Sequence, residues 1–230
     1  MELESIFKNF DRLIVLDTET TGLNFYNNQI IDLGVIEYKS INDCLVKTNE
    51  INILIKLEDN KKLPLEIVNL THITDSMLNT YGISLNEAKT MFFNLLNNDD
   101  KKLIATYNAQ FDLSFLRYFL KGYHLNKINF LDILTIYKDR AVYPQKLKDA
   151  VSHYHLDEIV KNSHRAMDDT LACFEVLKEM SKEKDDIINY VNLFGYNPNY
   201  GQPKILIKNV IYKPQPVNFE LPVFPLYKTN

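Results

Sequence analysis

Residues 13–22 read Leu-Ile-Val-Leu-Asp-Thr-Glu-Thr-Thr-Gly, so a run of aliphatic side chains ends in two carboxylates, Asp17 and Glu19. The aliphatic run predicts a buried β-strand, and the hydroxyl residues and glycine after it indicate a turn. Because side chains at positions i and i+2 of a strand point to the same face, the two carboxylates converge just beyond the strand. Converging anions repel each other unless a cation lies between them, and carboxylate oxygens suit Mg²⁺ or Mn²⁺. An isolated pair of this kind is more often the solvated cap of a turn, so the metal-site hypothesis depends on the rest of the chain.

The composition is that of an ordinary globular protein. The 230 residues are 46% hydrophobic and 24% charged, which indicates one domain of usual size with room for an appendage. A net charge of −4 argues against coating of duplex nucleic acid but allows a short strand to be held near divalent metals. The N-terminal residues show no secretory leader and no apolar run reaches transmembrane length, so we expect a soluble, cytoplasmic protein with no membrane partner. Cys44 and Cys173 lack the spacing of a disulfide framework or a zinc site.

Patterns along the chain predict a mixed α/β fold. After the first strand, residues 29–38 and 51–57 are expected to complete an antiparallel set, and residues 102–106 to form a further strand. Helices are expected at residues 63–70, 84–96, 111–120, 132–137, 146–153 and 165–180. In the second of these helices, Ser84 and Glu87 predict an N-terminal capping box. Strands first, then strand and helices in alternation, indicate a mixed central sheet flanked by helices.

The composition changes after about residue 184. Six of the eight prolines lie beyond that point, mixed with tyrosine, phenylalanine and an apolar stretch at residues 205–207. Such a segment favours extended pieces that pack on a surface over a second folded domain. We expect residues 1–184 to form the functional domain and residues 185–230 a proline- and aromatic-rich C-terminal extension. The extension either docks a partner protein or packs back onto its own domain.

Two later clusters supply further candidates for the same site. Asp112 follows the strand at residues 102–106 and lies in the first turn of a helix, where the helix dipole alone would favour a carboxylate. His164 precedes the helix at residues 165–180, and Asp169 lies about one turn inside it, so both can face the same side. A lone histidine before a helix is usually a surface or capping residue. Beside a metal-binding carboxylate, however, it has the position that a proton-accepting base needs.

Together, the three clusters resemble the three motifs of the DEDDh family of 3′→5′ exonucleases, which includes the epsilon-type proofreading subunits of bacterial DNA polymerase III. The matching patterns are Asp17-x-Glu19-Thr20-Thr21-Gly22, Asn108-x-x-x-Asp112 and His164-x-Ala166-x-x-Asp169. The resemblance covers roughly residues 11–180 and implies a ribonuclease H-like fold. The stretch at residues 71–74 is also similar to the family, but it has His72 where the family usually has glycine.

The resemblance implies a role for each catalytic candidate. The implied ligands of two divalent ions, Mg²⁺ or Mn²⁺, are Asp17, Glu19, Asp112 and Asp169. Two such ions can activate water and stabilise the leaving oxygen of a phosphodiester. His164 is the implied general base, because imidazole has a pKa near neutrality.

The resemblance also implies contacts with the substrate. Backbone groups around Thr18 and Thr20 would hold the terminal 3′ hydroxyl, and Leu23 would pack against the terminal base. Asn108 and Phe111 would line or support the same pocket. For Leu23 and Phe111, ordinary core packing is the alternative. Asp168 and the remaining histidines are expected at the surface without a role in the site.

The implied reaction is hydrolysis of single-stranded DNA from its 3′ end to nucleoside 5′-monophosphates, in proofreading or repair, with a DNA polymerase subunit as a partner. One alternative is a 3′→5′ exoribonuclease that trims RNA ends or digests short oligoribonucleotides. A second is a catalytically silent scaffold that binds a polymerase or a nucleic-acid end, although such a module would not need the full set of carboxylates.

Overall fold

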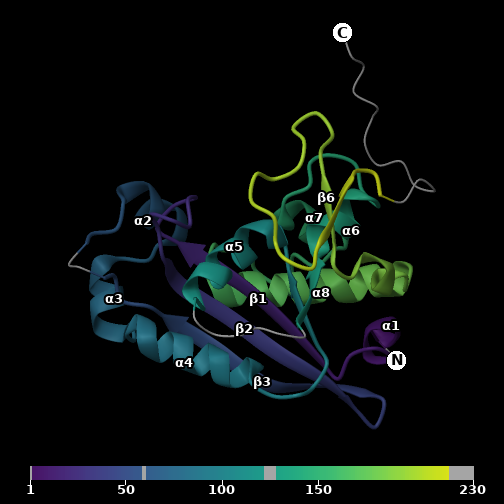
Figure 1. Cartoon of the computed structure of the whole chain (residues 1–230), viewed down its shortest axis with the longest axis horizontal. Helices are drawn as coiled ribbons and strands as arrows, with labels where there is room; N and C mark the ends of the chain where they lie inside the picture. The colour runs from purple at the N-terminus through teal and green to yellow at the C-terminus, as the bar shows by residue number, and fades with distance from the viewer. Residues whose placement is uncertain (1, 59–60, 122–127, 218–230) are drawn as a thin grey trace.

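The structure is a computed structural model that describes residues 2–58, 61–121 and 128–217. Within these residues, a central sheet has the strand order β3-β2-β1-β4-β5 (Figure 1). The strands are β1 Arg12–Thr20, β2 Ile30–Ile41, β3 Cys44–Leu54, β4 Lys102–Thr106 and β5 Ile128–Asp132. β1 pairs antiparallel with β2 and parallel with β4, so the prediction of a mixed sheet is confirmed.

Helices cover both faces of this sheet. Those in the described residues are α1 Glu4–Phe7, α2 Leu65–Thr71, α3 Asp75–Tyr81, α4 Leu85–Leu96, α5 Ala109–Phe119, α6 Ile133–Lys138, α7 Leu147–His153 and α8 Ala166–Glu183. α8 packs over one face of β1 and β2, in a core cluster with Leu13 and Val15, and Figure 1 shows it running along the sheet. α4 and α5 cover the opposite face, in a cluster with Ile14 and Leu16. Because both faces are buried, β1 has an unbroken aliphatic run in place of an alternating pattern.

β1 extends further than the sequence predicts. It continues through Asp17 and Glu19 to Thr20, because its backbone stays paired with β2. Asp17 lies opposite Gly34 and Glu19 opposite Asp32, and the pairing becomes irregular only between Glu19 and Thr20. The two carboxylates therefore do not converge just beyond the strand, as predicted. They lie within it, where the two-residue repeat still directs both to one face.

Other elements also differ from the prediction. β3 begins at Cys44 rather than at residue 51, and its first half is largely exposed, so it lacks the alternation that marks a half-buried strand. α3 and β5 were not predicted, since both are short and are stabilised mainly by packing on the rest of the domain. The six predicted helices correspond to α2, α4, α5, α6, α7 and α8, with shifts at their ends. The predicted capping box of α4 is confirmed in Ser84 and Glu87.

The described part of the C-terminal extension packs back onto the domain. It contains the 3₁₀ helix η1 Ile187–Tyr190 and the parallel strands β6 Leu193–Tyr196 and β7 Ile211–Pro214. Asn192 lies along β5, where its N–H donates to the Phe130 carbonyl (2.8 Å) and its side-chain oxygen accepts from the Phe130 N–H (2.8 Å). The Tyr212 hydroxyl donates to the Gln110 side chain on α5 (2.6 Å). Residues 218–230 lie outside the described residues, and the division of the chain at residue 184 stays a prediction.

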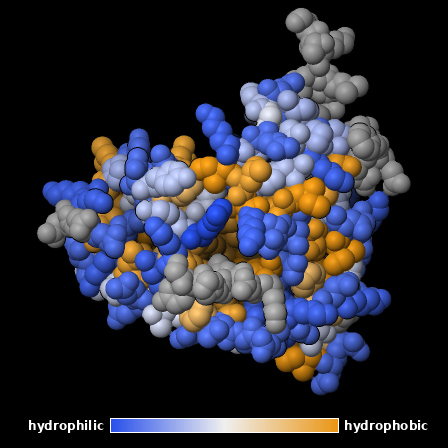
Figure 2. All heavy atoms as spheres, viewed as in Figure 1, coloured by the Kyte–Doolittle hydropathy of each residue, from blue (hydrophilic) through white to orange (hydrophobic). Residues whose placement is uncertain are grey.

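The surface shows where apolar side chains come together. Figure 2 shows apolar side chains gathered in places among hydrophilic ones on this face of the molecule. An apolar pocket of about 160 Å³ lies between α4, α5 and residues 207–209 of the extension, with Phe92, Leu116 and Ile207 in its wall.

No helix in the part of the chain that the structure describes is long and apolar enough to cross a membrane. Cys44 is exposed, Cys173 is buried, and both are free thiols.

Gly34 on β2 lets α8 approach the sheet closely. A Cβ atom at this position would lie 2.4 Å from the Ala166 carbonyl oxygen at the start of α8. The Thr170 hydroxyl donates to the Gly34 carbonyl (3.1 Å), so α8 is also tied to this point of the sheet. Gly34→Ala is expected to lower the free energy of unfolding by about 1–3 kcal/mol, as overpacking of a core does. Urea unfolding measures this loss, and an unchanged midpoint would contradict the close fit.

Candidate active site

The predicted carboxylates converge where β1 passes between the first turns of α5 and α8. Asp17 and Glu19 on β1 are half-buried, and Asp169 is buried in the first turn of α8. Glu19, His164 and Asp169 each offer one ligand atom, and these atoms lie within 4.8 Å of one another. The structure thus brings together residues that are about 150 positions apart in the sequence.

Asp112 is held on the α5 side by two threonines. Its Oδ1 accepts from the backbone N–H (3.1 Å) and the hydroxyl (2.7 Å) of Thr18. Its Oδ2 accepts from the Thr106 hydroxyl at the end of β4 (3.0 Å). Asp112 is 2% exposed, so these hydrogen bonds replace the water that its carboxylate would otherwise bind. Thr18 therefore fixes Asp112, a contact that sequence reasoning missed.

Asp169 has its own set of donors. Its Oδ1 accepts from the Asn162 side chain (2.8 Å) and from the Ser163 N–H (3.1 Å), both in the loop that leads into α8. The Asn162 and Ser163 contacts carry no sequence signal beyond their position before the helix. Asp168, predicted to face solvent, is half-buried and accepts from the Ser163 hydroxyl.

A fifth acidic residue, Asp32 on β2, fixes the start of α8. Its Oδ2 accepts from Arg165 Nε (2.9 Å) and from the Ala166 N–H (3.3 Å). Asp32 is 1% exposed, and its Oδ1 accepts no hydrogen bond from the described residues. The Asp32–Arg165 ion pair holds His164 next to Glu19, because Arg165 follows His164 directly. The predicted strand at residues 29–38 includes Asp32, but its sequence pattern gives this residue no role.

Burial raises the pKa of every carboxylate in the cluster, and at Asp17 and Glu19 the charges of the neighbouring carboxylates raise it further. Burial is the largest cause for each, and it raises the pKa of Glu19 to about 8, of Asp112 to about 7 and of Asp169 to about 6. The pKa of Asp17 is also raised well above its usual value, first by burial and then by the charges of Asp112, Asp169 and Glu19. Arg165 opposes the shift at Glu19, but it comes after the carboxylate neighbours in size.

This donor set fits a divalent metal. Four carboxylates and a histidine face one region, and burial makes their joint ionisation unfavourable unless a cation shares the space. Oxygen-rich sites of this kind suit Mg²⁺ or Mn²⁺. His153 and His155 do not belong to the cluster. Both are exposed, and the His153 ring lies against Tyr137 and Tyr154.

Two residues in the site have left-handed backbone conformations. His164 has a φ of 56° and an exposed side chain, and Asn108, the N-cap of α5, has a φ of 65° and is also exposed. His72 at the end of α2 has a φ of 58°, which glycine adopts without strain. The family usually has glycine at the position of His72, and glycine would adopt this left-handed backbone without strain.

The predicted substrate contacts differ in their exposure. Leu23 is 86% exposed, so its alternative assignment to the core is wrong. Phe111 is half-buried, and its ring centroid lies 5.0 Å from that of Phe115 in the core under α5. Thr20 is buried, and its hydroxyl donates to the Gly22 carbonyl (2.8 Å).

The chain is similar in sequence to bacterial DNA polymerase III proteins. The PolC-type DNA polymerase III of Clostridium perfringens is 28% identical over 195 residues, which are 83% of this chain and 12% of that protein. The DNA polymerase III epsilon subunit of Buchnera aphidicola subsp. Baizongia pistaciae is 27% identical over 204 residues, which are 84% of this chain and 78% of the subunit. The chain thus spans only a small part of the PolC-type relative.

A solved structure with the same fold is the nuclease domain of 3′hExo, a DEDDh family member, bound to rAMP. It superimposes with a TM-score of 0.62 at 17% identity, over 79% of this chain and 97% of that domain. This likeness confirms the ribonuclease H-like fold class. The model of the Exonuclease family, RNase_T, matches residues 14–177. The chain therefore belongs to the Exonuclease family.

Proposed function

We propose that this chain hydrolyses single-stranded DNA from its 3′ end and releases nucleoside 5′-monophosphates, as a proofreading-type exonuclease. The observation that carries the proposal is the convergence of Glu19, His164 and Asp169 within 4.8 Å, beside Asp17 and the fixed carboxylate of Asp112. The DNA preference is supported by the relatives, both of which are DNA polymerase III proteins.

The proposed metal ligands are Asp17, Glu19, Asp112 and Asp169. Two Mg²⁺ or Mn²⁺ ions, when bound, would supply charge stabilisation and activation of water for attack on phosphorus. Thr18 and Thr106 keep Asp112 in one orientation, and Asn162 and Ser163 do the same for Asp169. Held ligands need no rearrangement when the site is filled, which favours a precise geometry.

His164 is the proposed general base. Hydrolysis forms one bond from water oxygen to phosphorus and breaks the bond from phosphorus to the 3′ oxygen, so water must lose a proton. The exposed imidazole of His164 can accept that proton, and the nearby carboxylates of Glu19 and Asp169 stabilise the imidazolium that results. The exposed side chain of Leu23 and the ring of Phe111 would contact the terminal base.

His164→Asn is expected to lower kcat by about 100- to 10,000-fold, the usual contribution of a general base. Asparagine tolerates the left-handed backbone at this position (φ 56°), so the loop keeps its path. His155→Asn is a matched control, because His155 is also exposed and has a φ of 57°. The stabilisation of His164→Asn by Mg²⁺ should remain largely intact. Native kinetics in this variant would remove the role assigned to His164.

The runner-up function is 3′→5′ hydrolysis of RNA. The structural neighbour bound to rAMP favours it, because that ligand is a ribonucleotide. A two-metal carboxylate site acts on the phosphodiester, which DNA and RNA share. The choice between DNA and RNA therefore depends on contacts with the sugar. The substrate experiment below distinguishes the two activities.

The proposal is tested with matched DNA and RNA single strands labelled at the 5′ end, incubated with Mg²⁺ or Mn²⁺. We expect a ladder that shortens from the 3′ end of DNA and disappears with chelator or in Asp169→Ala. Shortening of RNA alone would establish the runner-up. If neither strand is shortened with either metal, the catalytically silent scaffold replaces both.

The proposal includes a DNA polymerase as a partner, since both relatives are polymerase III proteins. Mixing the chain with the replicative polymerase subunit of the same organism and measuring co-elution by size-exclusion chromatography tests this point. We expect a shared peak. Separate elution across the accessible range of concentration would overturn the partnership and leave the exonuclease activity unaffected.

A further inference from the structure

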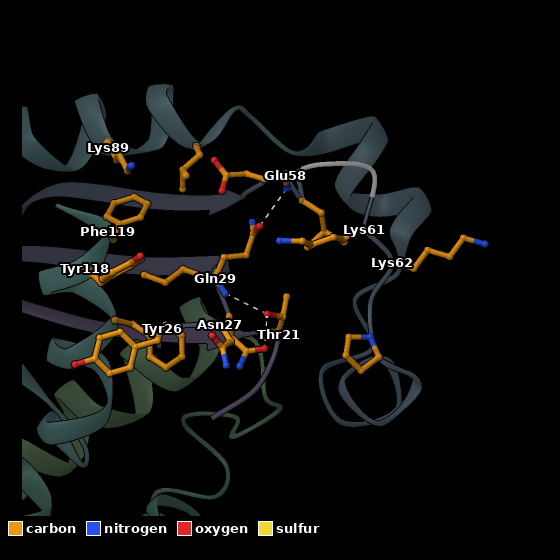
Figure 3. Close-up of a pocket in the computed structure, with 16 residues that line it drawn as sticks. Thr21, Tyr26, Asn27, Gln29, Glu58, Lys61, Lys62, Lys89, Tyr118 and Phe119 are labelled. Atoms are coloured by element: carbon orange, nitrogen blue, oxygen red, sulfur yellow. Dashed lines mark hydrogen bonds between the residues drawn. The ribbon is translucent and has the colours of Figure 1, made fainter. Parts of the chain in front are cut away.

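A pocket of about 500 Å³ lies on the face of the sheet covered by α4 and α5 (Figure 3), and Thr21 in its wall comes two residues after Glu19. Its walls come from Thr21 just after β1, residues 26–30, the two helices, and Leu57, Glu58, Lys61, Lys62 and Pro64. None of its lining residues takes part in the proposed catalytic reaction. We call it the upstream pocket.

The upstream pocket presents aromatic rings to solvent. Tyr26 is 59% exposed and Tyr118 is 47% exposed, and their ring centroids lie 6.2 Å apart at an interplanar angle of 77°. Phe25 contacts both tyrosines, with ring centroids 4.3 Å from Tyr26 and 6.4 Å from Tyr118. Because their neighbours fix the two tyrosines, they offer ordered surfaces on which nucleobases can stack.

The same pocket collects positive charge in an acidic chain. Among the described residues, its wall contains Lys61, Lys62 and Lys89, against the single carboxylate of Glu58. Figure 3 shows Lys61 pointing toward Gln29 across the pocket, and Lys62 pointing away from it. Lys89 Nζ lies 5.9 Å from the centre of the Phe119 ring. Cations beside stacking rings are the combination that binds a single strand, because each phosphate carries a negative charge.

The upstream pocket joins the catalytic site through two elements. Thr21, which lines the pocket, comes two residues after Glu19, and its hydroxyl accepts from the Gln29 N–H (3.1 Å). On α5, Phe115 in the pocket contacts Phe111 beside Asp112. Both links place the pocket next along β1 and α5 from residues of the catalytic site, on the side from which a bound strand can extend.

We propose that the upstream pocket binds the nucleotides on the 5′ side of the scissile phosphate, with bases stacked on Tyr26 and Tyr118 and phosphates near Lys61 and Lys89. This inference rests on the proposed function, because it assumes a single strand with its 3′ end at the carboxylates. The pocket thereby sets the preference for longer strands, while the carboxylates act on the terminal nucleotide alone.

The test compares a twelve-nucleotide oligothymidylate with the dinucleotide of thymidine, which is too short to cross the pocket. Tyr26→Ala/Tyr118→Ala is expected to raise the KM for the long strand by about 5- to 100-fold, from the loss of base stacking. Its kcat/KM for the dinucleotide should stay at the native value. Tyr118→Phe should retain long-strand binding, and Tyr200→Ala is a matched control because Tyr200 is 88% exposed in the extension.

A binding measurement separates this inference from the proposed function. Fluorescence anisotropy with the labelled long strand and Asp17→Asn as background reports binding without cleavage. Weaker binding when Tyr26→Ala/Tyr118→Ala is added supports the pocket even if the chain degrades no substrate. If the double variant binds and degrades the long strand as the native chain does, the upstream pocket is not a subsite, whatever the activity on the dinucleotide.

Lys89→Gln provides an independent check on the charge. Replacing one lysine that contacts a phosphate should reduce the salt dependence of long-strand binding by a slope of about 1. Lys148→Gln on α7, an exposed lysine outside the pocket, is the control and should leave the slope unchanged. An unchanged slope in Lys89→Gln would remove Lys89 from the proposed path of the strand.

Discussion

Asp17→Asn is expected to reduce Mg²⁺-dependent exonuclease activity by about 1,000-fold or more, since loss of a metal-binding charge removes several kcal/mol of transition-state stabilisation. The same substitution should raise the melting temperature of the metal-free protein. Burial and the neighbouring carboxylates raise the pKa of Asp17 well above its usual value, so ionised Asp17 opposes folding when no cation is present. Asparagine has nearly the same shape and carries no charge, so it relieves the repulsion.

Single-turnover cleavage of a labelled strand measures the first effect, and thermal melting in EDTA measures the second. Asp157→Asn is a suitable control, because Asp157 is an exposed residue outside the cluster. It should change neither quantity strongly. Native activity in Asp17→Asn would contradict the assigned metal ligand, and a lower melting temperature in EDTA would contradict the account of repulsion.

The metal-free protein is expected to become less stable as the pH rises from about 5 to about 8. In the folded chain, burial raises the pKa of Glu19 to about 8, of Asp112 to about 7 and of Asp169 to about 6. The folded state therefore holds more protons than the unfolded state in this range. Its stability is fully present below the unfolded pKa values and is lost as the pH rises through the folded ones.

The size of this loss follows from the pKa shifts. Each pKa unit corresponds to about 1.4 kcal/mol, so Glu19 alone sets an upper limit of about 5 kcal/mol once it is fully ionised. Mg²⁺ binds the ionised, folded state and should restore about 2.7 kcal/mol at a concentration 100 times its Kd. The gain on adding Mg²⁺ should therefore be larger at pH 8 than at pH 5.

Urea unfolding in EDTA at several pH values, repeated with Mg²⁺, checks this expectation. Glu19→Gln should flatten the pH profile in EDTA, because it removes the group with the highest of the three pKa values. A stability that rises with pH between about 5 and 8 in EDTA would contradict the prediction.

Sequence patterns predicted the parts of this molecule that depend on local regularity. Local sequence patterns predict three of these parts: the buried strand at residues 13–16, the capping box of α4 and the long helix α8. In each, a hydrophobic repeat or a capping pair is typical of a single structure. The convergence of Glu19, His164 and Asp169 was predicted from the resemblance of three motifs to one family, since no single motif specifies it.

The groups that hold the site in place were not predictable in the same way. Thr18 and Thr106 donate to Asp112 from β1 and β4, and Arg165 pairs with Asp32 across 133 positions of sequence. Such contacts depend on the register between strands, which a single sequence does not encode as a repeat. The packing of the extension depends likewise on tertiary contacts, because β6 and β7 are short strands far from their partners in sequence.

The two edges of the central sheet bear on how this protein behaves at high concentration. An exposed edge strand can pair with a strand of another molecule and start aggregation. β3 counters this with polar and charged side chains such as Lys47 and Glu50, and with the irregular pairing at Glu37 on β2. β5 is shielded differently, because Asn192 of the extension bonds both the N–H and the carbonyl of Phe130. A chain shortened before Asn192 would leave this edge open, and intermolecular strand pairing would then limit its solubility.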